Sequence, residues 1–483
     1  MTGATTGAQL GAMAAPPVLD SGFVRAALRA ELRESRGPDT TFTRAVIDSR
    51  RAGPGDLFVA LPGERTDGHD FAADAVARGA SGVLLTHEVT GIGDNTACFL
   101  VPDALTALQT LATAWRDALP HLDVVGVTGN VGKSTTKLIA AALLAPRYRV
   151  QVNEANYNNE IGVPLCLLEL RPETERAVIE MGMYTTGEIA LLCRWTHPRI
   201  GIVLNVGPVH LERAGSLDVI ARAKRELPES LPADGHAVLN ADDAVVRAMA
   251  SHTRARVWLC GTAEDADVRG TDLDRHAANG FAFTLRYQTH ARRVHVPLPG
   301  AHLLSNVLAA AAAALADDVP FEAVCDAIEQ LEVPTRLAIH TLPGGVTLLD
   351  DTYNASPLAT IAALDLLAET PGRRIALLGD MLELGDLAPS EHARVGRYAA
   401  GIVDALYTVG ELGRLLSDAA RADGLANTTH CTTKDAAIDA LRATLRPGDV
   451  LLVKASRGLA LETVVQALRA DAAGTGAAGG TDR

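Results

Sequence analysis

Residues 124–136 read VVGVTGNVGKSTT, and this stretch is the best guide to how the chain folds. Its apolar beginning is typical of a buried strand, and residues 138–144 continue with a helical pattern, which is the context that a phosphate-binding loop requires. The common form of that loop has one more glycine, at the place where this chain has Val127. A purely structural glycine turn is the alternative, but the flanking strand and helix favour a phosphate loop.

A loop of this kind binds phosphate mainly through its backbone. Glycines allow N–H groups to point inward, and the N-terminus of the following helix adds positive potential. A lysine reaches the outer phosphates and a hydroxyl can bind magnesium, roles that fall here to Lys133 and Ser134. The predicted nucleotide contacts are Thr128, Gly129, Asn130, Val131, Gly132, Lys133, Ser134 and Thr135.

Short apolar runs alternate with amphipathic stretches on both sides of the loop. Each run is followed by a turn and then a helical pattern, which is typical of parallel α/β sheets. No repeat of 20 to 50 residues is visible, so a solenoid is not expected. The runs predicted to be buried strands are 124–127, 177–179, 200–205, 346–349, 375–378 and 450–453.

The length of the chain predicts about three domains. It has 483 residues, and a domain takes roughly 150. Breaks near 119–121 and 333–335 supply two boundaries. We therefore predict an α/β protein with a tail at 1–17, a first domain at 18–120, a central domain with the phosphate loop and a parallel sheet at 121–334, a Rossmann-like α/β domain at 335–470, and a tail at 471–483.

The composition excludes several classes of function. Lys and Arg total 44 against 58 Asp and Glu, a formal net charge of −14, so a broad grip on nucleic acid is not expected. The six cysteines are scattered and form no Cys-x-x-Cys pair, which argues against a disulfide framework or a structural zinc site. The first residues carry no basic residue and no sustained apolar run, so we expect no secretory signal, and we see no apolar run long enough to predict a membrane span. We expect a reduced, cytoplasmic protein.

Polar residues follow several predicted strands. Glu180 ends one of them and His210 follows the next, and ligand groups gather at the carboxyl ends of parallel strands, so both are placed to reach a metal–phosphate site. The asparagine-rich segment 153–164 either holds a polar ligand or forms a solvated turn. Asn306, near the start of an alanine-rich helix, either caps that helix or contacts an adenine edge. Lys224 lies in a plain helical pattern, and nothing local distinguishes it.

Three more polar strand ends occur in the last third of the chain. They are residues 349–357 (LDDTYNASP), 378–385 (LGDMLELG) and 454–458 (KASRG). Since all three follow strands assigned to one domain, they predict a binding cleft there.

Taken together, these segments resemble the Mur ligases of peptidoglycan synthesis, most closely the branch that adds D-alanyl-D-alanine. The resemblance covers most of the chain outside the tails and is carried also by residues 48–50, 55–61, 67–71 and 454–457. The segments that look particular to this branch are 156–164, 350–355 and 378–385. Leu303, Arg225 and Ala455 depart from the family pattern, whereas Asn306 and Lys224 keep it.

The resemblance implies roles that composition does not reveal. Lys224 matches a family lysine that carries a carbamate, an anion able to help hold a second magnesium ion. The implied metal ligands are Ser134, Glu180, His210 and Lys224, and the implied catalytic residues are Lys133, Lys224 and His210. Additional ATP contacts are expected from Asn306, Arg336 and Asp351. Substrate contacts are expected from Ser49, Arg50, Asn158, Asn159, Tyr353 and Asn354, with the first two at the uridine nucleotide.

The resemblance also implies a reaction. An ATP-dependent ligase would join the terminal carboxylate of UDP-N-acetylmuramoyl tripeptide to the amine of D-alanyl-D-alanine through an acyl phosphate, releasing ADP and phosphate and using two magnesium ions. Closure of the third domain is expected to keep water from the acyl phosphate. The accompanying expectations are a monomer without nucleic-acid or membrane partners, and a part in cell-wall synthesis, cell shape and cell division.

Other functions stay open at this point. Another amide ligase of the same superfamily, such as the diamino-acid-adding enzyme or a folylpolyglutamate synthetase, would differ in its amine. A phosphate-loop regulatory NTPase would hydrolyse nucleotide without peptide substrates and would not need the first domain. A ligase-like binding protein that has lost activity is a further alternative, although the lysine and serine of the loop are both present.

Overall fold

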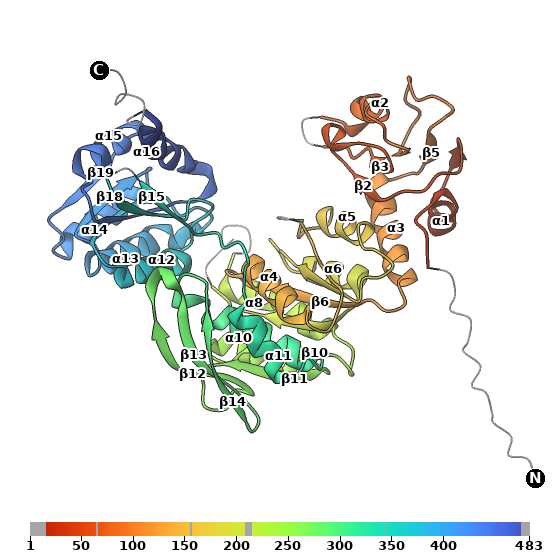
Figure 1. Cartoon of the computed structure of the whole chain (residues 1–483). Helices are drawn as coiled ribbons and strands as arrows, with labels where there is room; N and C mark the ends of the chain where they lie inside the picture. The colour runs from red at the N-terminus through yellow and green to blue at the C-terminus, as the bar shows by residue number, and fades with distance from the viewer. Residues whose placement is uncertain (1–15, 64–65, 155–156, 208–214, 343, 475–483) are drawn as a thin grey trace, which may run out of the picture. The chain divides into compact units, whose positions relative to one another are not determined.

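The computed structural model of the protein describes residues 16–63, 66–154, 157–207, 215–342 and 344–474 (Figure 1). The chain divides into two compact units, Met1–Leu122 with Ile161–Glu175, and Asp123–Glu160 with Arg176–Arg483. The described part of the first unit contains one sheet and that of the second contains two. Three sheet-containing α/β regions confirm the predicted fold class, while the domain boundaries stay predictions.

The first unit is built on a five-stranded sheet in the order β1-β5-β4-β3-β2, parallel except for the pairing of β1 with β5. Its strands are β1 (Glu34–Arg36), β2 (Arg44–Val46), β3 (Asp56–Val59), β4 (Gly82–Leu85) and β5 (Ala97–Leu100). Its helices are α1 (Ser21–Ala27), α2 (Ala72–Ala77), α3 (Ala104–Ala118) and α5 (Gly162–Leu168). The Trp115 indole N–H on α3 donates to the Leu170 carbonyl at 2.9 Å and so joins the later segment to this unit.

The second unit begins with a nine-stranded sheet in the order β14-β13-β12-β11-β10-β9-β6-β8-β7. Its strands are β6 (Asp123–Thr128), β7 (Val150–Val152), β8 (Arg176–Glu180), β9 (Pro198–Val203), β10 (His236–Asn240), β11 (Arg256–Gly261), β12 (Val268–Arg275), β13 (Phe281–Tyr287) and β14 (His290–Val296). Strands β6, β8 and β9 confirm three of the predicted strands. The run from β7 to β12 is parallel, and β12 to β14 form an antiparallel meander.

The order of these strands fixes where a ligand can bind. Strand β6 lies between β8 on one side and β9 on the other. The strands that follow β6 in sequence are therefore added first on one side of it, as β7 and β8, and then on the other, as β9. In open α/β sheets, ligands bind beyond the carboxyl ends of the strands at such a switch point. The phosphate loop follows β6 at this point.

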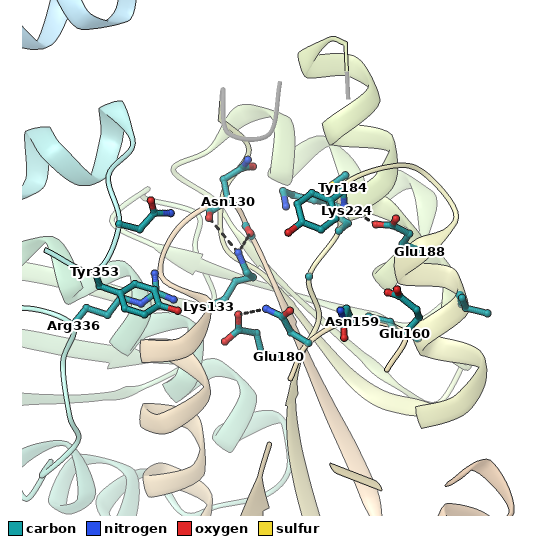
Figure 2. Close-up of a pocket in the computed structure, with 17 residues that line it drawn as sticks. Asn130, Lys133, Asn159, Glu160, Glu180, Tyr184, Glu188, Lys224, Arg336 and Tyr353 are labelled. Atoms are coloured by element: carbon teal, nitrogen blue, oxygen red, sulfur yellow. Dashed lines mark hydrogen bonds between the residues drawn. The ribbon is translucent and has the colours of Figure 1, made fainter. Parts of the chain in front are cut away.

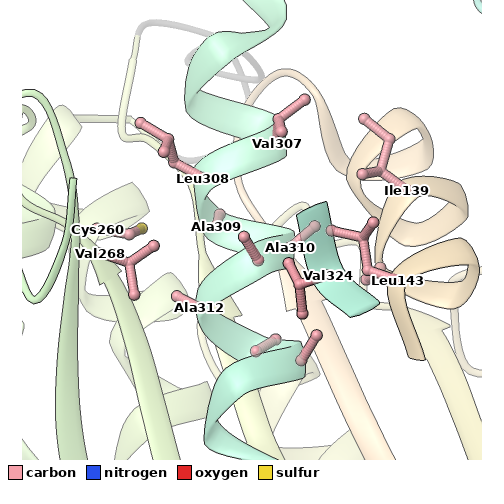
Figure 3. Packing of buried hydrophobic residues seen from close by; sticks show 14 of the residues in the cluster. Ile139, Leu143, Cys260, Val268, Val307, Leu308, Ala309, Ala310, Ala312 and Val324 are labelled. Atoms are coloured by element: carbon pink, nitrogen blue, oxygen red, sulfur yellow. The ribbon is translucent and has the colours of Figure 1, made fainter. Parts of the chain in front are cut away.

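Helix α10 (Leu304–Ala316) packs beside α4 (Lys133–Leu144) and against strands β9 to β12 of the nine-stranded sheet (Figure 3). Its residues from Val307 to Ala316 are all buried, and Ala309 to Ala314 is an unbroken alanine run. Methyl side chains let the helix backbone lie close to both neighbours. The other helices of this region are α6 (Glu188–Thr196), α8 (Leu217–Ser230), α9 (Ala244–Ala248) and α11 (Phe321–Glu329).

We expect Ala310→Leu to lower the free energy of unfolding of the second unit by about 1–3 kcal/mol, because extra methylenes cannot fit a fully packed site. Ala310 is 0% exposed. Urea unfolding followed by tryptophan fluorescence measures the loss. The control is Ala443→Leu on an exposed face of α15 (Lys434–Thr444), which should stay within about 0.5 kcal/mol of the original. Equal stability of the two variants would contradict the packing argument.

The third sheet has the order β15-β16-β20-β17-β18-β19, parallel except for β15 with β16. Its strands are β15 (Ala338–Leu342), β16 (Val346–Asp350), β17 (Arg373–Gly379), β18 (Ala405–Val409), β19 (Thr428–Cys431) and β20 (Asp449–Lys454), and its helices are α12 (Pro357–Glu369), α13 (Ala388–Ala400), α14 (Gly413–Ala422), α15 and α16 (Glu462–Gly474). Strands β16, β17 and β20 confirm the other predicted strands. None of the helices in the described part of the chain has the length and apolarity needed to cross a membrane.

Candidate active site

The phosphate loop connects β6 to α4 and is held in shape by its own glycines and by a neighbouring asparagine. Gly132 has φ +85°, and a Cβ atom there would lie 2.3 Å from Asn306 Nδ2, so only glycine fits. The backbone N–H groups of Asn130 and Val131 both donate to Asn205 Oδ1 at 2.9 Å, and Asn205 Nδ2 donates to the Val131 carbonyl at 3.0 Å. Asn205 was not among the predicted site residues; its place just after β9 is the signal that points to it.

Lys133 begins α4 and turns back over the loop (Figure 2). Its ammonium group donates to the carbonyls of Gly129 at 2.8 Å and Asn130 at 3.2 Å. Burial lowers the pKa of this lysine, the carboxylate of Glu180 opposes that shift, and the charge of Arg336 adds to it. The two hydrogen bonds hold this amino group against the loop, where phosphate oxygens would bind.

Ser134 and Glu180 form the oxygen-rich side of the site. The Ser134 hydroxyl donates to Glu180 Oε2 at 2.7 Å, and Arg336 Nη2 donates to the same hydroxyl at 2.8 Å. Asn158 Nδ2 donates to Glu180 Oε1 at 2.8 Å. A hydroxyl and a carboxylate side by side are hard oxygen donors, the kind that magnesium takes. The residues present therefore fit a magnesium ion at Ser134 and Glu180.

Lys224 lies on α8, and its side chain is only 2% exposed. Burial is the main cause that lowers the pKa of its amine well below the usual value, and the charge of Lys133 acts in the same direction. A lysine with a lowered pKa has more of the neutral, nucleophilic amine. The structure thus distinguishes Lys224 chemically, which its local sequence does not.

Lys133, Glu180 and Lys224 meet in one cavity of about 310 Å³. Figure 2 shows Lys133 and Glu180 on one side and Tyr184 and Lys224 on the other. The cavity is also lined by Gly129, Asn130, Asn158, Asn159, Glu160, Glu188, Arg336, Tyr353 and Asn354. Half of the predicted central-domain site residues thus line a single space, and Tyr184, Glu160 and Glu188 are lining residues that were not predicted.

Residues from the segments that flank β15 and β16 also line this space. The Arg336 guanidinium lies 4.5 Å from the centre of the Tyr353 ring, a cation–π contact. Asp351 does not line the cavity; its carboxylate instead accepts from the buried Lys454 ammonium group at 2.5 Å. The same ammonium group donates to the Asn354 carbonyl at 2.8 Å. Lys454 therefore holds together the segment that carries Tyr353 and Asn354.

Other predicted residues form hydrogen bonds within the protein that support the loop and its neighbouring elements. Asn306 is the third residue of α10, so it does not cap that helix; its amide donates to the Gly132 carbonyl at 3.1 Å and to Thr136 Oγ1 at 2.7 Å. A contact of Asn306 with adenine stays a prediction. The Thr128 hydroxyl donates to the Met181 carbonyl at 3.0 Å, and Thr135 is buried in the first turn of α4. His210 lies outside the described residues.

In the first unit, Ser49 and Arg50 are neighbours in a short 3-10 turn, Ser49–Arg51. Arg50 Nε and Nη2 donate to the Asp48 carboxylate at 2.9 and 2.7 Å. The Arg50 guanidinium is the main cause that lowers the pKa of the Asp48 carboxyl to about 2. Ser49 is buried, whereas the Arg50 side chain is 82% exposed. Uridine binding by this pair stays a prediction.

Comparison with known proteins assigns the chain to a family. Three family descriptions match in order: "Mur ligase family, catalytic domain" over residues 41–114, "Mur ligase middle domain" over 127–314, and "Mur ligase, glutamate ligase domain" over 335–457. The UDP-N-acetylmuramoyl-tripeptide–D-alanyl-D-alanine ligase of Synechocystis is 40% identical over 441 residues, which span 90% of this chain and 93% of the relative. The chain belongs to the Mur ligase family.

Solved Mur ligases share the fold as well. MurF from Acinetobacter baumannii superposes with a TM-score of 0.84 at 29% identity, covering 94% of this chain and 100% of that one. MurF from Thermotoga maritima, solved in complex with ADP, gives a TM-score of 0.78 at 27% identity and covers 89% and 98%. The phosphate loop, Glu180, Lys224 and Asn306 all fall within the segment that matches the Mur ligase middle domain.

Proposed function

We propose that this Mur ligase joins D-alanyl-D-alanine to a UDP-N-acetylmuramoyl tripeptide, with ATP as the energy source and ADP and phosphate as products. The names of its relatives from Synechocystis and Escherichia coli, 40% and 37% identical, support this substrate pair. The ADP complex of the Thermotoga maritima relative supports the nucleotide. The observation that carries the proposal is the single cavity in which Lys133, Glu180 and Lys224 meet.

The reaction has two steps. In the first, an oxygen of the tripeptide carboxylate forms a bond to the γ-phosphorus of ATP, and the bond to ADP breaks. Lys133 supplies positive charge where the phosphoryl oxygens gather, and Arg336, already bonded to Ser134 at 2.8 Å, supplies a second cation from the third sheet. In the second, the dipeptide amine adds to the acyl phosphate, phosphate leaves, and the amine releases a proton.

Ser134 and Glu180 hold magnesium in this proposal, and the ion when bound neutralises phosphate charge during transfer. Lys224 carries a carbamate that helps to hold a second ion, formed when its neutral amine adds to CO₂ and releases a proton. His210 completes the ligand set. Asn158, Asn159, Tyr353 and Asn354 contact the peptide substrates, Asn306 and Asp351 act at the nucleotide, and Ser49 and Arg50 bind the uridine nucleotide.

The proposed place of this reaction is the cytoplasm, in the supply of cell-wall precursor and therefore in cell shape and division. We propose a monomer, because one chain contains all of the proposed groups. A diamino-acid-adding ligase is the nearest alternative. A regulatory NTPase is less compatible, because the chain matches Mur ligase families over all three segments.

We expect a preference for D-alanyl-D-alanine over D-alanine of about a hundredfold in kcat/KM. A site that pairs both the amide and the carboxylate of the dipeptide leaves buried groups unpaired with a shorter amine, at about 1–3 kcal/mol each. The measurement is phosphate release and product formation with D-alanyl-D-alanine, D-alanine, meso-diaminopimelate, L-lysine and L-glutamate, each with its matching acceptor.

Omission of each acceptor is the control for uncoupled ATP hydrolysis. Faster turnover of a diamino acid on a UDP-muramoyl dipeptide would move the protein to the preceding step of the pathway. Faster turnover of glutamate on a folate would remove it from the pathway, and acceptor-independent hydrolysis would favour the NTPase.

A further inference from the structure

A second lysine lies on the same face of α4 as Lys133, one turn later. Lys137 is 3% exposed, so its charged group is almost completely removed from water. Residues four apart on a helix are neighbours on one face. The Lys137 Nζ atom donates to the Asn153 carbonyl at 2.6 Å.

Asn153 links that lysine to the candidate magnesium site. It is 2% exposed and follows β7, which is the edge strand of the sheet and pairs in parallel only with β8. Its side-chain Oδ1 accepts from the Glu180 backbone N–H at 3.0 Å, and its Nδ2 donates to the Tyr157 carbonyl at 2.8 Å. One side chain thus contacts both the end of β8 and Tyr157, the residue before Asn158.

Glu180 is the residue at which these contacts meet, through its backbone N–H from Asn153 and through its carboxylate from Asn158. Glu180 is 1% exposed; its backbone is held by Asn153, and its Oε1 accepts from Asn158 at 2.8 Å. The Asn158 side chain is in turn packed over Gly182, where a Cβ atom would lie 2.9 Å from Asn158 Oδ1. The remaining oxygen of Glu180 faces the Ser134 hydroxyl.

We propose that Lys137 and Asn153 form a strut, extending from α4 to the end of β8, that sets the position of the Glu180 carboxylate for magnesium. Both are positioning residues, since neither lies in the lining of the cavity. The strut rests on the proposed function, because it presupposes that Ser134 and Glu180 hold the ion. Groups that orient a metal ligand commonly change metal affinity by about 10–100-fold when they are removed.

The test is calorimetric titration of ADP into the full-length protein at a series of magnesium concentrations and in excess EDTA. Lys137→Met removes the donor but keeps a long apolar side chain, and Asn153→Ala removes both side-chain hydrogen bonds. Each should raise the half-saturating magnesium concentration for ADP binding about tenfold, with ADP affinity in EDTA unchanged. The matched control is Lys434→Met, because Lys434 also bonds a backbone carbonyl, that of Ala460 at 3.5 Å, but lies on α15.

A double variant tests whether Lys137 and Asn153 act through one path or affect magnesium binding independently. Since both residues act through one path, Lys137→Met with Asn153→Ala should raise the half-saturating concentration no further than the larger single change, still about tenfold. A multiplied rise of about a hundredfold overturns the proposal, as does a normal magnesium requirement in both single variants. Loss of ADP binding in EDTA also overturns it, because the residues would then hold the whole loop. If ADP binding by the unaltered protein does not depend on magnesium, the result contradicts the proposed metal site itself.

Discussion

Replacing Lys133 by alanine should lower kcat for ligation at least about a thousandfold while leaving the protein folded. The ammonium group is at the N-terminus of α4, against the carbonyls of Gly129 and Asn130. It lies against the loop that would hold the phosphate, and charge stabilisation of a transferring phosphoryl group is a dominant part of such catalysis. The measurement is ADP formation that depends on both the tripeptide and the dipeptide.

The fold should survive this change, because the Lys133 side chain is half-buried and its ammonium group bonds to carbonyls of its own loop. Circular dichroism and the thermal midpoint test that part, and Lys434→Ala on α15 serves as a lysine control of unchanged activity. Near-normal turnover of the Lys133 variant would show that the loop does not bind the transferring phosphate.

Lys224→Arg should be as inactive as Lys224→Ala, each about a hundredfold or more below the original. If the lysine acts as a positive charge, arginine would replace it in part. If it acts as a carbamate, arginine cannot, because its guanidinium stays protonated and does not take up CO₂. The 2% exposure of Lys224 leaves little room for the larger head group as well. Steady-state kinetics of both variants with saturating magnesium makes the comparison.

A small carboxylate in the buffer tests whether an inactive arginine variant lacks the anion of a carbamate or only lacks room for the larger head group. Acetate or formate in the buffer should restore part of the activity of Lys224→Ala, because it supplies the missing anion in the space that the side chain vacates. The same additive should do nothing for Lys224→Arg or for the Lys133 variant. Activity in the arginine variant would show that no carbamate is needed.

The sequence predicted the central strands and the loop because their signals are local. Glycine spacing and apolar runs identified β6, β8 and β9, although the helix was expected from residue 138 and begins at Lys133. The first turn of α4 is polar and lacks the apolar period of a helix, so the sequence pattern does not indicate that the helix begins at Lys133. The meander of β12 to β14 had no such signal, because its strands carry many charged residues on exposed faces.

The supporting residues of the site could not be found in this way. Asn205 bonds backbone groups 74 and 75 residues away, and Lys137 and Asn153 act on the end of another strand. Such contacts depend on which strands become neighbours, and a single sequence does not state that order. Lys224 shows the same limit, because its burial, rather than its neighbours in sequence, makes it chemically unusual.

The alanine helix α10 has a consequence for how the protein can evolve. Because Ala309 to Ala314 contribute only methyl groups, no long side chain is present there to rotate and absorb a change in volume, and Asn306 on the same helix lies against Gly132 of the loop. We therefore expect few substitutions to be tolerated where α10 packs against α4 and the sheet. We expect changes that alter substrate choice to be tolerated more easily at the strand ends of the third sheet and in the first unit, away from this closely packed helix.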